Sequence, residues 1–413
     1  MVNEVLRTDI PNDWDVITLG DYAQIFRGGS PRPIQAFLTT SDQGINWIKI
    51  GDVGAGEKFI ESTEEKIIPE GVSRSRMVYK GDLILSNSMS YGRPYIMNIE
   101  GCIHDGWLVI QKYDRLFNRE YLYYALSSDL TMQQYVAMAA GSSVQNLNKE
   151  KVSKVVLPCP KISEQKKIAE VLSSIDALIV DLQKLIRKKK DIRQGTMQML
   201  VTGKKRLDGF DGEWVKINLS KNSKLKARIG WQGLTTAEYL DEGYSYLITG
   251  TDFKDGQINW NGCHYVDYNR YEQDPNIQVS NGDLLLTKDG TIGKVAYVAD
   301  LTRPATLNSG VFLVKPITDA YTAHFMFYVL ESSVFKDFLQ QLSAGSTINH
   351  LYQKDLVKFD LYVPPTKEEQ EAIAAILFDM DSDIHKLEAK LEKYQKVKQG
   401  MTEELLTGKV RLM

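Results

Sequence analysis

The longest regular pattern of apolar positions in this chain occurs twice, at residues 161–207 and again at 366–413. Within each segment apolar side chains recur at alternating steps of four and three residues, which is the heptad seam of a coiled-coil helix. The pattern therefore predicts two long α-helices. The seam positions of the first copy are Ile168, Leu172, Ile175, Ile179, Leu182 and Ile186. Those of the second copy are Ile373, Leu377, Met380, Ile384, Leu387 and Leu391.

The two helical segments are copies of each other without a gap. Adding 205 to the residue number gives an identical residue at seventeen positions, among them Glu164, Asp176 and Arg206. A single apolar seam needs a second helix to cover it, and the nearest candidate is the other copy. We therefore expect the two helices to pair antiparallel and to act as a rigid spacer. An ordinary pair of core helices is the plainer alternative.

Local signals indicate where these helices begin and end. Thr366 and Glu369 have the spacing of a capping box at the start of the second helix. Gly203 and Gly408 suit the left-handed position that follows a helix C-terminus. A continuous helix from Glu164 to Leu200 would be about 55 Å long at about 1.5 Å per residue.

Residues 1–160 and 208–365 contain short apolar runs separated by glycine and polar turns, which is typical of a mixed domain of strands and helices. In the first segment we expect a helix at Arg119–Ala139 and strands at Asp21–Phe26, Asn46–Val53, Gly81–Ser86, Trp107–Gln111 and Val152–Leu157. The second segment repeats motifs of the first: Trp14 recurs as Trp214, Leu19 as Leu219, and Gly81-Asp82-Leu83 as Gly282-Asp283-Leu284.

These patterns predict an α+β fold. Two similar mixed α/β domains, at 1–160 and 208–365, are joined by two long antiparallel coiled-coil helices, at 161–207 and 366–413, with pseudo-two-fold symmetry. The repeated scaffold carries loops that differ between the two halves, so the domains can bind two different targets.

Composition narrows the class of protein further. The net charge is −3, which argues weakly against a lone monomer that binds nucleic acid, although local basic patches remain possible. The three cysteines are scattered without a CxxC pair, so neither a disulfide framework nor a zinc site is indicated. The sequence begins without a signal peptide and has no apolar stretch long enough to span a membrane. We expect a cytoplasmic protein.

Catalytic motifs are absent from the sequence. There is no GxxxxGK[ST] phosphate loop, no NPPY-like segment of an amino-methyltransferase and no HExxH zinc motif. The five histidines are isolated from one another. We therefore expect no catalytic centre, no cofactor and no metal in this chain.

Taken together, the layout resembles the specificity subunit of type I restriction-modification systems over essentially the whole chain. The resemblance rests on the segments KGDLILSNSMSYGR and NGDLLLTKDGTIGK, on a Gly-Ser pair in each half, and on the Pro-x4-Gln entry into each helix. The Gly-Ser pairs are Gly141-Ser142 and Gly345-Ser346, and the helix entries are Pro160 with Gln165 and Pro365 with Gln370. Any one of these motifs alone would be weak, whereas the combination is specific.

The resemblance implies a non-catalytic DNA-binding subunit. In that family two target recognition domains alternate with two helical spacers and read an asymmetric, bipartite site in double-stranded DNA. Two methyltransferase subunits dock on the specificity subunit, and restriction subunits join them. S-adenosylmethionine, ATP and Mg would then belong to the partner subunits.

The polar, glycine-rich loops are the candidate DNA-binding sites, because sequence readout needs Arg, Asn or Gln at base edges and small polar groups at phosphates. The plainer alternative is that each loop is a surface turn. In the first half the candidates are Arg27, Arg32, Ser88, Tyr91, Arg93, Ser142, Ser143, Gln145 and Asn146. In the second half they are Arg228, Trp231, Gln232, Lys288, Thr291, Lys294, Ser346, Thr347, Asn349 and His350.

Some alternatives stay open from the sequence. The basic run at residues 184–193 could lie along DNA, meet an acidic partner, or be a solvated helix face. The chain could also be a stand-alone methyltransferase or nuclease, although the missing cofactor motifs speak against an enzyme. A third possibility is an adaptor with paired domains and no role in DNA binding.

Overall fold

The computed structural model describes residues 10–54, 56–87, 92–139, 147–230, 233–343 and 350–412. The chain divides into two compact units. Unit 1 contains residues 1–183 together with 389–413, and unit 2 contains residues 184–388. Each unit therefore contains one globular domain and a segment of each long helix.

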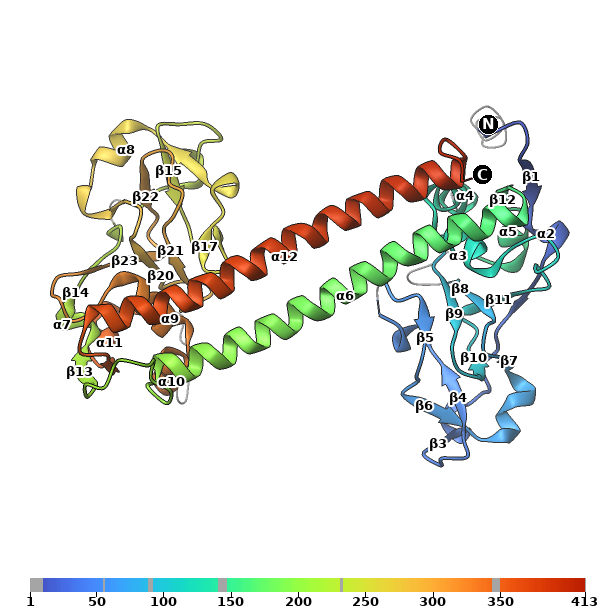
Figure 1. Cartoon of the computed structure of the whole chain (residues 1–413), viewed down its shortest axis with the longest axis horizontal. Coiled ribbons are helices and arrows are strands. Elements are labelled where there is room, and N and C mark those ends of the chain that lie inside the picture. Colours follow the sequence, from blue (N-terminus) through green and yellow to red (C-terminus); the bar gives the residue numbers. More distant parts are fainter. Residues whose placement is uncertain are drawn as a thin grey trace. The chain divides into compact units, whose positions relative to one another are not determined.

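The two long helices are present as the heptad pattern predicts. Helix α6 spans Ile162–Val201 and helix α12 spans Lys367–Thr407 (Figure 1). Gly203 and Gly408 follow them with φ angles of 69° and 74°, in the left-handed region that glycine adopts without strain. None of the twelve seam side chains is exposed, since each is buried or half-buried.

In its described residues, unit 1 is built from short strands and four short α-helices besides its segments of α6 and α12. Its strands are β1 (Asp15–Thr18), β2 (Gln24–Arg27), β3 (Leu38–Thr39), β4 (Ile45–Ile48), β5 (Phe59–Ile60), β6 (Glu65–Ile67), β7 (Arg76–Val78), β8 (Leu83–Ser86), β9 (Pro94–Met97), β10 (Gly101–Ile103), β11 (Trp107–Gln111) and β12 (Val156–Cys159). Its helices are α2 (Leu19–Tyr22), α3 (Arg119–Ser127), α4 (Asp129–Ala139) and α5 (Lys149–Ser153). The strands form sheets in the orders β2-β11-β8-β9-β5, β3-β6-β4-β10-β7 and β1-β12.

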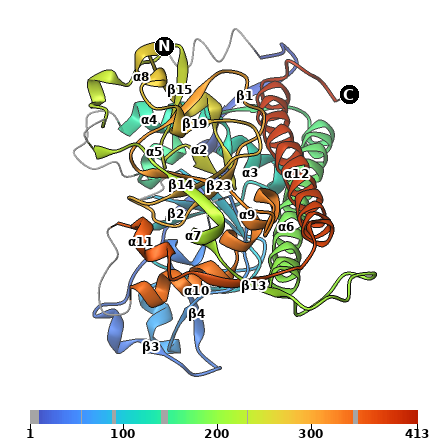
Figure 2. The ribbon, with the colours of Figure 1, turned by 90° about the vertical axis from the view of Figure 1, so that its left-hand side faces the viewer.

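Unit 2 repeats this architecture. Its strands are β13 (Val215–Asn218), β14 (Ser223–Lys226), β15 (Ser245–Ile248), β16 (Phe253–Lys254), β17 (Gln257–Ile258), β18 (His264–Val266), β19 (Gln278–Val279), β20 (Leu284–Thr287), β21 (Val295–Tyr297), β22 (Ala305–Leu307), β23 (Val311–Pro316) and β24 (Asp360–Val363). Its helices are α7 (Leu219–Asn222), α8 (Tyr268–Glu272), α9 (Ala323–Glu331), α10 (Ser333–Leu342) and α11 (Gln353–Leu356), several of which are visible in Figure 2. Its sheets have the orders β14-β23-β20-β21, β18-β15-β22-β19, β13-β24 and β16-β17.

The repeated Gly-Asp-Leu motif opens the central strand of each unit. Leu83 and Leu85 of β8 face one hydrophobic core, and Ile84 faces a second core on the other side of the sheet. Likewise, alternate residues of β20 face two different cores. Because side chains alternate along a strand, burial on both faces explains the uninterrupted apolar run of the motif.

Four predictions of local structure were wrong in type or bounds. The strand expected at Asp21–Phe26 begins only at Gln24, because Leu19–Tyr22 form α2, and the strand expected at Asn46–Val53 ends at Ile48, because Ile50–Asp52 form a short 3-10 helix.

The segment expected as one helix, Arg119–Ala139, is two helices that are interrupted at Ser128, whose hydroxyl donates to the Ala125 carbonyl at 2.7 Å. This bond competes with the helical backbone ladder and ends α3. The strand expected from residue 152 begins only at Val156, because Asn148 caps α5 by accepting a hydrogen bond from the Lys151 amide.

In each unit, the start of one long helix is held by an arginine from the segment that follows the end of the other long helix. In unit 1, Glu164 near the start of α6 pairs with Arg411 at 2.7 Å and accepts a hydrogen bond from the Trp14 indole at 3.2 Å. In unit 2, the carboxylate of Glu369, near the start of α12, accepts two hydrogen bonds from the Arg206 guanidinium, one from Nε at 2.6 Å and one from Nη2 at 2.8 Å. The helix segments are therefore antiparallel within each unit. The capping box expected at Thr366 and Glu369 is half formed, because the Glu369 amide donates to the Thr366 hydroxyl at 3.3 Å while the Glu369 carboxylate serves this ion pair instead.

The pair formed by Glu164 makes the stability of unit 1 sensitive to acid. The Arg411 guanidinium lowers the pKa of Glu164 below its ordinary value. The unfolded chain therefore binds this proton more tightly than the folded unit. The stabilisation is fully present above the unfolded-state pKa of about 4.3 and is lost as the pH falls through the folded pKa.

We therefore predict that Glu164→Gln lowers the melting temperature at pH 7 and reduces its fall between about pH 5 and pH 3. Thermal unfolding followed across this range measures both effects. Glu170→Gln, an exposed position on the same helix, is the matched control and should follow the wild-type curve. Parallel curves for Glu164→Gln and the wild type would contradict the assignment.

Candidate nucleic-acid interface

Each unit presents a β-hairpin whose loop carries several of the predicted DNA-binding residues. In unit 1 the hairpin joins β8 to β9, and in unit 2 it joins β20 to β21. The Arg93 amide donates to the Ser86 hydroxyl at 3.1 Å, and the Lys294 amide donates to the Thr287 hydroxyl at 2.9 Å. The same bond therefore places Arg93 and Lys294 at equivalent positions, and both side chains are exposed.

A glycine before each of these cations makes the hairpin possible. Gly92 and Gly293 have φ angles of 82° and 86°, which side chains rarely allow. A Cβ atom on Gly92 would lie 2.7 Å from the ring of Tyr135 in α4, and one on Gly293 would lie 2.4 Å from Leu339 in α10. Both hairpins are therefore held against a helix by a position that only glycine fits well.

In unit 2 the structure brings the hairpin together with the segment around His350. The Leu351 amide donates to the Lys288 carbonyl at 2.8 Å, and the His350 imidazole contacts the Asp289 carboxylate. Lys288 and His350 are half-buried, whereas Thr291 and Lys294 are exposed. Four predicted DNA-binding residues of unit 2 thus lie on one surface. They are Lys288, Thr291 and Lys294 of the hairpin, and His350.

In unit 1 the predicted arginines lie beside the turn between β10 and β11. The side chains of Arg27 and Arg32 are 54% and 83% exposed, and both approach Asp105 in this turn. The turn is joined to the hairpin because the Asn87 side chain donates to the Asp105 carbonyl at 2.9 Å. Arg27, Arg32 and the base of the hairpin therefore share one network.

The burial of Arg228 argues against its predicted contact with DNA. Its side chain is 2% exposed and donates to the Leu307 carbonyl at 2.9 Å and to the Thr306 hydroxyl at 3.2 Å. This guanidinium is held inside unit 2 by strand β22, so in this conformation it does not reach solvent. The sequence shows an arginine in a glycine-containing loop, but not that its side chain points inward while the next residue, Ile229, is exposed.

The remaining candidates lie outside the described residues, and their surroundings are therefore not assigned. They are Ser88, Tyr91, Ser142, Ser143, Gln145, Asn146, Trp231, Gln232, Ser346, Thr347 and Asn349.

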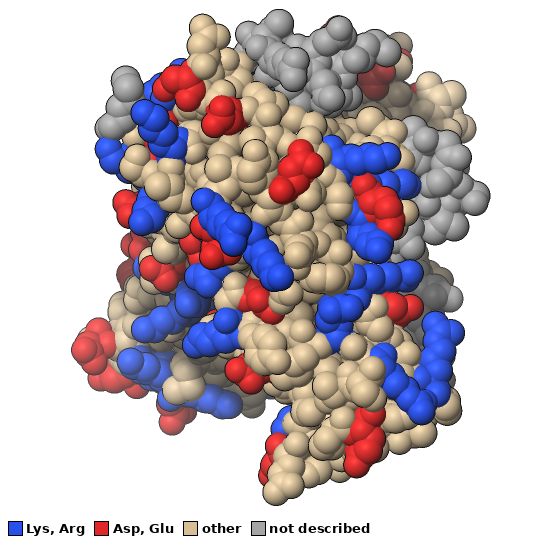
Figure 3. All heavy atoms as spheres, turned by 90° about the vertical axis from the view of Figure 1, so that its right-hand side faces the viewer, with Lys and Arg blue, Asp and Glu red and all other residues tan. Residues whose placement is uncertain are grey.

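Half of the six cations in the basic run at residues 184–193 are paired with carboxylates of unit 2. Three of its cations pair with carboxylates of α9 and α12, which favours a role in holding helices together over one in binding DNA. The pairs are Lys189 with Asp383 at 3.2 Å, Lys190 with Glu388 at 2.6 Å, and Arg193 with Asp381 at 2.8 Å and Glu331 at 2.5 Å. On the face of unit 1 in Figure 3, Lys and Arg are likewise interspersed with Asp and Glu.

Within the described ranges, no group of three or more His, Cys, Asp or Glu side chains is arranged to hold a metal ion. In the same part of the chain, no helix has both the length and the apolar character that crossing a membrane requires.

Comparison with known families decides the identity of the chain. The model of the family described as "Type I restriction modification DNA specificity domain" matches residues 11–194 and again 204–398. The chain belongs to this type I specificity family. Its two matches correspond to the duplication seen in the sequence, so the chain has two target recognition domains.

Relatives of the type I specificity family cover nearly the whole chain. The MjaVIII specificity subunit of Methanocaldococcus jannaschii is 24% identical over 98% of this chain and 94% of its own length. The putative MjaX specificity subunit of the same organism is 26% identical over 98% and 95%. The crystal structure of a type I system S subunit from M. genitalium has a TM-score of 0.62 at 15% identity and covers 97% of both chains, which supports the fold.

Sequence reasoning missed three polar residues that organise these surfaces. They are Asn87, Asp105 and Asp289, which lie at the base of a hairpin, in the β10–β11 turn, and in the hairpin of unit 2. Asp105 and Asp289 each precede a glycine, which is an ordinary signal for a turn. Their partners lie far away in sequence, so nothing local distinguishes them from other turn residues.

Proposed function

We propose that this chain is the sequence-specific DNA-binding subunit of a type I restriction-modification complex. It reads a bipartite, asymmetric site in double-stranded DNA, one half-site with each unit. The observation that carries this proposal is that both units present the same hairpin platform, closed by the same hydrogen bond, with different side chains at equivalent positions. One scaffold with two sets of side chains suits two different half-sites.

The proposal assigns the chain no chemistry of its own. Two methyltransferase subunits dock on its repeated helices, restriction subunits join them, and these partners bring S-adenosylmethionine, ATP and Mg. The helices set the distance between half-sites. At 40 and 41 residues each is about 60 Å long, which is enough to span one DNA turn of about 34–36 Å.

The proposal is tested by sequencing the methylated sites in the native host, with and without the gene for this chain. The expected result is a bipartite methylated sequence that disappears on deletion. Purified chain, with and without its methyltransferase, should bind that duplex with an affinity that falls steeply with salt. Methylation by the chain alone would support an enzyme, and the absence of any DNA binding would support an adaptor.

We predict that the hairpins act on separate half-sites. Arg93→Ala should reduce selectivity in one half-site, and Lys294→Ala should reduce it in the other, each by about tenfold if a base contact is lost. Mapping methylated sites for each variant measures the effect. Lys80→Ala, which removes an exposed cation elsewhere in unit 1, is the control. A change in both half-sites from either variant would contradict the assignment.

A further inference from the structure

A single turn residue in unit 1 organises the two exposed arginines. The Asp105 carbonyl accepts hydrogen bonds from Nε of Arg27 and from the Asn87 side chain, both at 2.9 Å. Its carboxylate oxygen Oδ2 lies 3.8 Å from a guanidinium nitrogen of Arg27 and 3.8 Å from one of Arg32. One residue therefore contacts both predicted arginines and the base of the hairpin.

The carboxylate of Asp105 is itself fixed in direction. The Ser30 hydroxyl lies 2.7 Å from Oδ1 of Asp105, and the Asp105 amide lies 3.3 Å from the same hydroxyl. This hydrogen bond from Ser30 is the main reason that the pKa of Asp105 lies below its ordinary value. The group is therefore ionised at neutral pH, with one oxygen held by Ser30 and the other turned toward the arginines.

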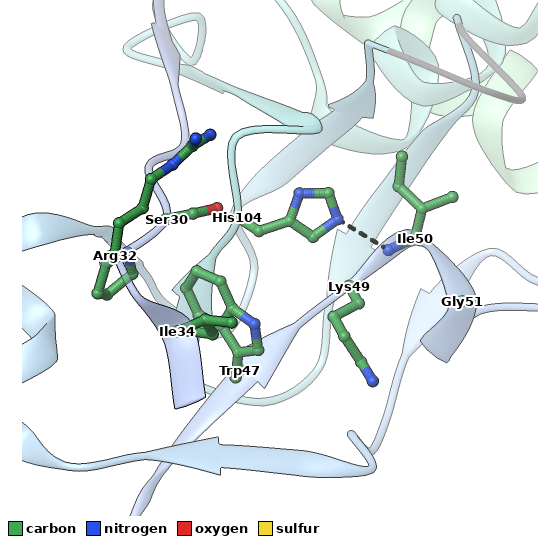
Figure 4. A pocket seen from close by; sticks show the side chains of 9 residues that line it. Ser30, Arg32, Ile34, Trp47, Lys49, Ile50, Gly51 and His104 are labelled. Atoms are coloured by element: carbon green, nitrogen blue, oxygen red, sulfur yellow. Dashed lines mark hydrogen bonds between the residues drawn. The ribbon is translucent and has the colours of Figure 1, made fainter. Parts of the chain in front are cut away.

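These ion pairs contribute little to the stability of the fold. The Arg32 side chain is 83% exposed and the Asp105 side chain is 42% exposed. Pairs this exposed contribute little because water and salt screen them. Figure 4 shows Arg32 extending from the rim of a recess of about 490 Å³ that Trp47, His104 and neighbouring residues line. The contacts thus orient charged groups at the surface without closing a core.

Unit 2 makes the same turn without the carboxylate. The Asn87 amide donates to the Gly106 carbonyl, and the Lys288 amide donates to the Gly310 carbonyl, both at 2.9 Å. The equivalence of the two turns places Ser309 where unit 1 has Asp105. A carboxylate is therefore not required for this fold to form the turn, and its presence in unit 1 needs another explanation.

We propose that Asp105 is a positioning residue that determines base specificity in unit 1, by presenting Arg27 and Arg32 to guanine. This inference rests on the proposed function and names the base that the site reads. Guanidinium groups pair in a bidentate manner with O6 and N7 of guanine in the major groove, which a lysine ammonium cannot imitate. A guanidinium that is already oriented loses less conformational freedom on binding. The negative charge of Asp105 also disfavours indiscriminate contact with phosphates.

The test uses the full chain with its methyltransferase, and the half-site of unit 1 is assigned from the Arg93→Ala variant. The wild type is expected to require guanine at one or more positions of that half-site. Asp105→Asn should reduce the preference for guanine at such a position about tenfold or more. The same variant should bind non-cognate duplex more tightly and with a steeper dependence on salt, because it loses a negative charge and releases two cations.

Two further variants keep the test independent of folding. Arg32→Lys and Arg27→Lys keep the positive charge but lose the planar guanidinium. At least one of them should reduce the preference for guanine at the same base position without tightening the binding of non-cognate duplex. Asp42→Asn removes an exposed carboxylate elsewhere in unit 1 and should change neither measurement. A merely destabilised unit 1 would weaken binding to cognate and non-cognate duplexes together.

The outcomes separate this inference from the proposed function. If the wild type recognises no specific sequence, the proposed function fails. If it recognises a bipartite site but unit 1 requires no guanine, only the present inference is overturned. Unchanged base preference in Asp105→Asn would overturn it as well.

Discussion

Replacing Leu405 by alanine is expected to destabilise unit 1 strongly and to leave the stability of unit 2 unchanged. Leu405 lies in α12 and is 3% exposed, in the hydrophobic core that also contains Leu172 and Leu122 of unit 1. Truncating a buried leucine to alanine costs about 2–5 kcal/mol, a large share of a domain's stability of about 5–15 kcal/mol. Hydrogen exchange should therefore show reduced protection of the most stable amides in residues 10–183 and normal protection across 184–388.

Because the chain is duplicated, the equivalent substitution can be made in unit 2. Leu200 in α6 is the equivalent of Leu405, is also 3% exposed, and lies in the core of unit 2. Leu200→Ala should therefore reduce protection across residues 184–388 and leave protection in unit 1 unchanged. Val410→Ala, at a position that is 44% exposed in the same terminal segment, controls for substitution near Leu405. Equal loss of protection in both units from either leucine variant would show that the units do not unfold separately.

Inserting one heptad into both long helices is expected to lengthen the spacer of the recognised DNA site and to leave both half-sites unchanged. Seven residues add about 10 Å at about 1.5 Å per residue. At about 3.4 Å per base pair this distance corresponds to about three base pairs. A whole heptad preserves the apolar seam, so the cores of both units should be unaffected.

The insertions belong between Gln183 and Lys184 and between Glu388 and Ala389, where the two units meet along the sequence. Sequencing the methylated sites of this variant measures spacer and half-sites together. A heptad inserted into α6 alone is the control and should abolish methylation, because the two helices then differ in length. An altered half-site with an unchanged spacer would refute the view that the helices set the distance.

The repeated helices could be predicted because their signal is local and periodic. A seam at steps of four and three residues requires a helix, and the glycines at 203 and 408 end it for reasons that lie within one turn. The interruption at Ser128 could not be read in this way. The Ser128 hydroxyl bonds to a carbonyl three residues earlier. A serine inside an apolar helical pattern does not by itself indicate that its side chain will form this bond and end the helix.

The candidate surface was harder to predict because its organisation is not local. Asp105 meets Ser30 and Arg27 across more than seventy residues of sequence, so only the fold brings them together. The burial of Arg228 has the same origin, since strand β22 supplies its hydrogen-bond acceptors. Glu369 shows that a correct local signal can be partly overridden, because Arg206, in the segment that follows α6, takes the carboxylate that a capping box would use.

The division of each long helix between the two units affects the order in which the protein can fold during synthesis. Residues 184–388 are all present once Glu388 has been made, so unit 2 can complete its core at that point. Unit 1 still lacks Leu405, Leu406 and Arg411, which close its core and its ion pair. The domain that is translated first therefore depends on the residues that are translated last, whereas unit 2 needs no residue beyond Glu388.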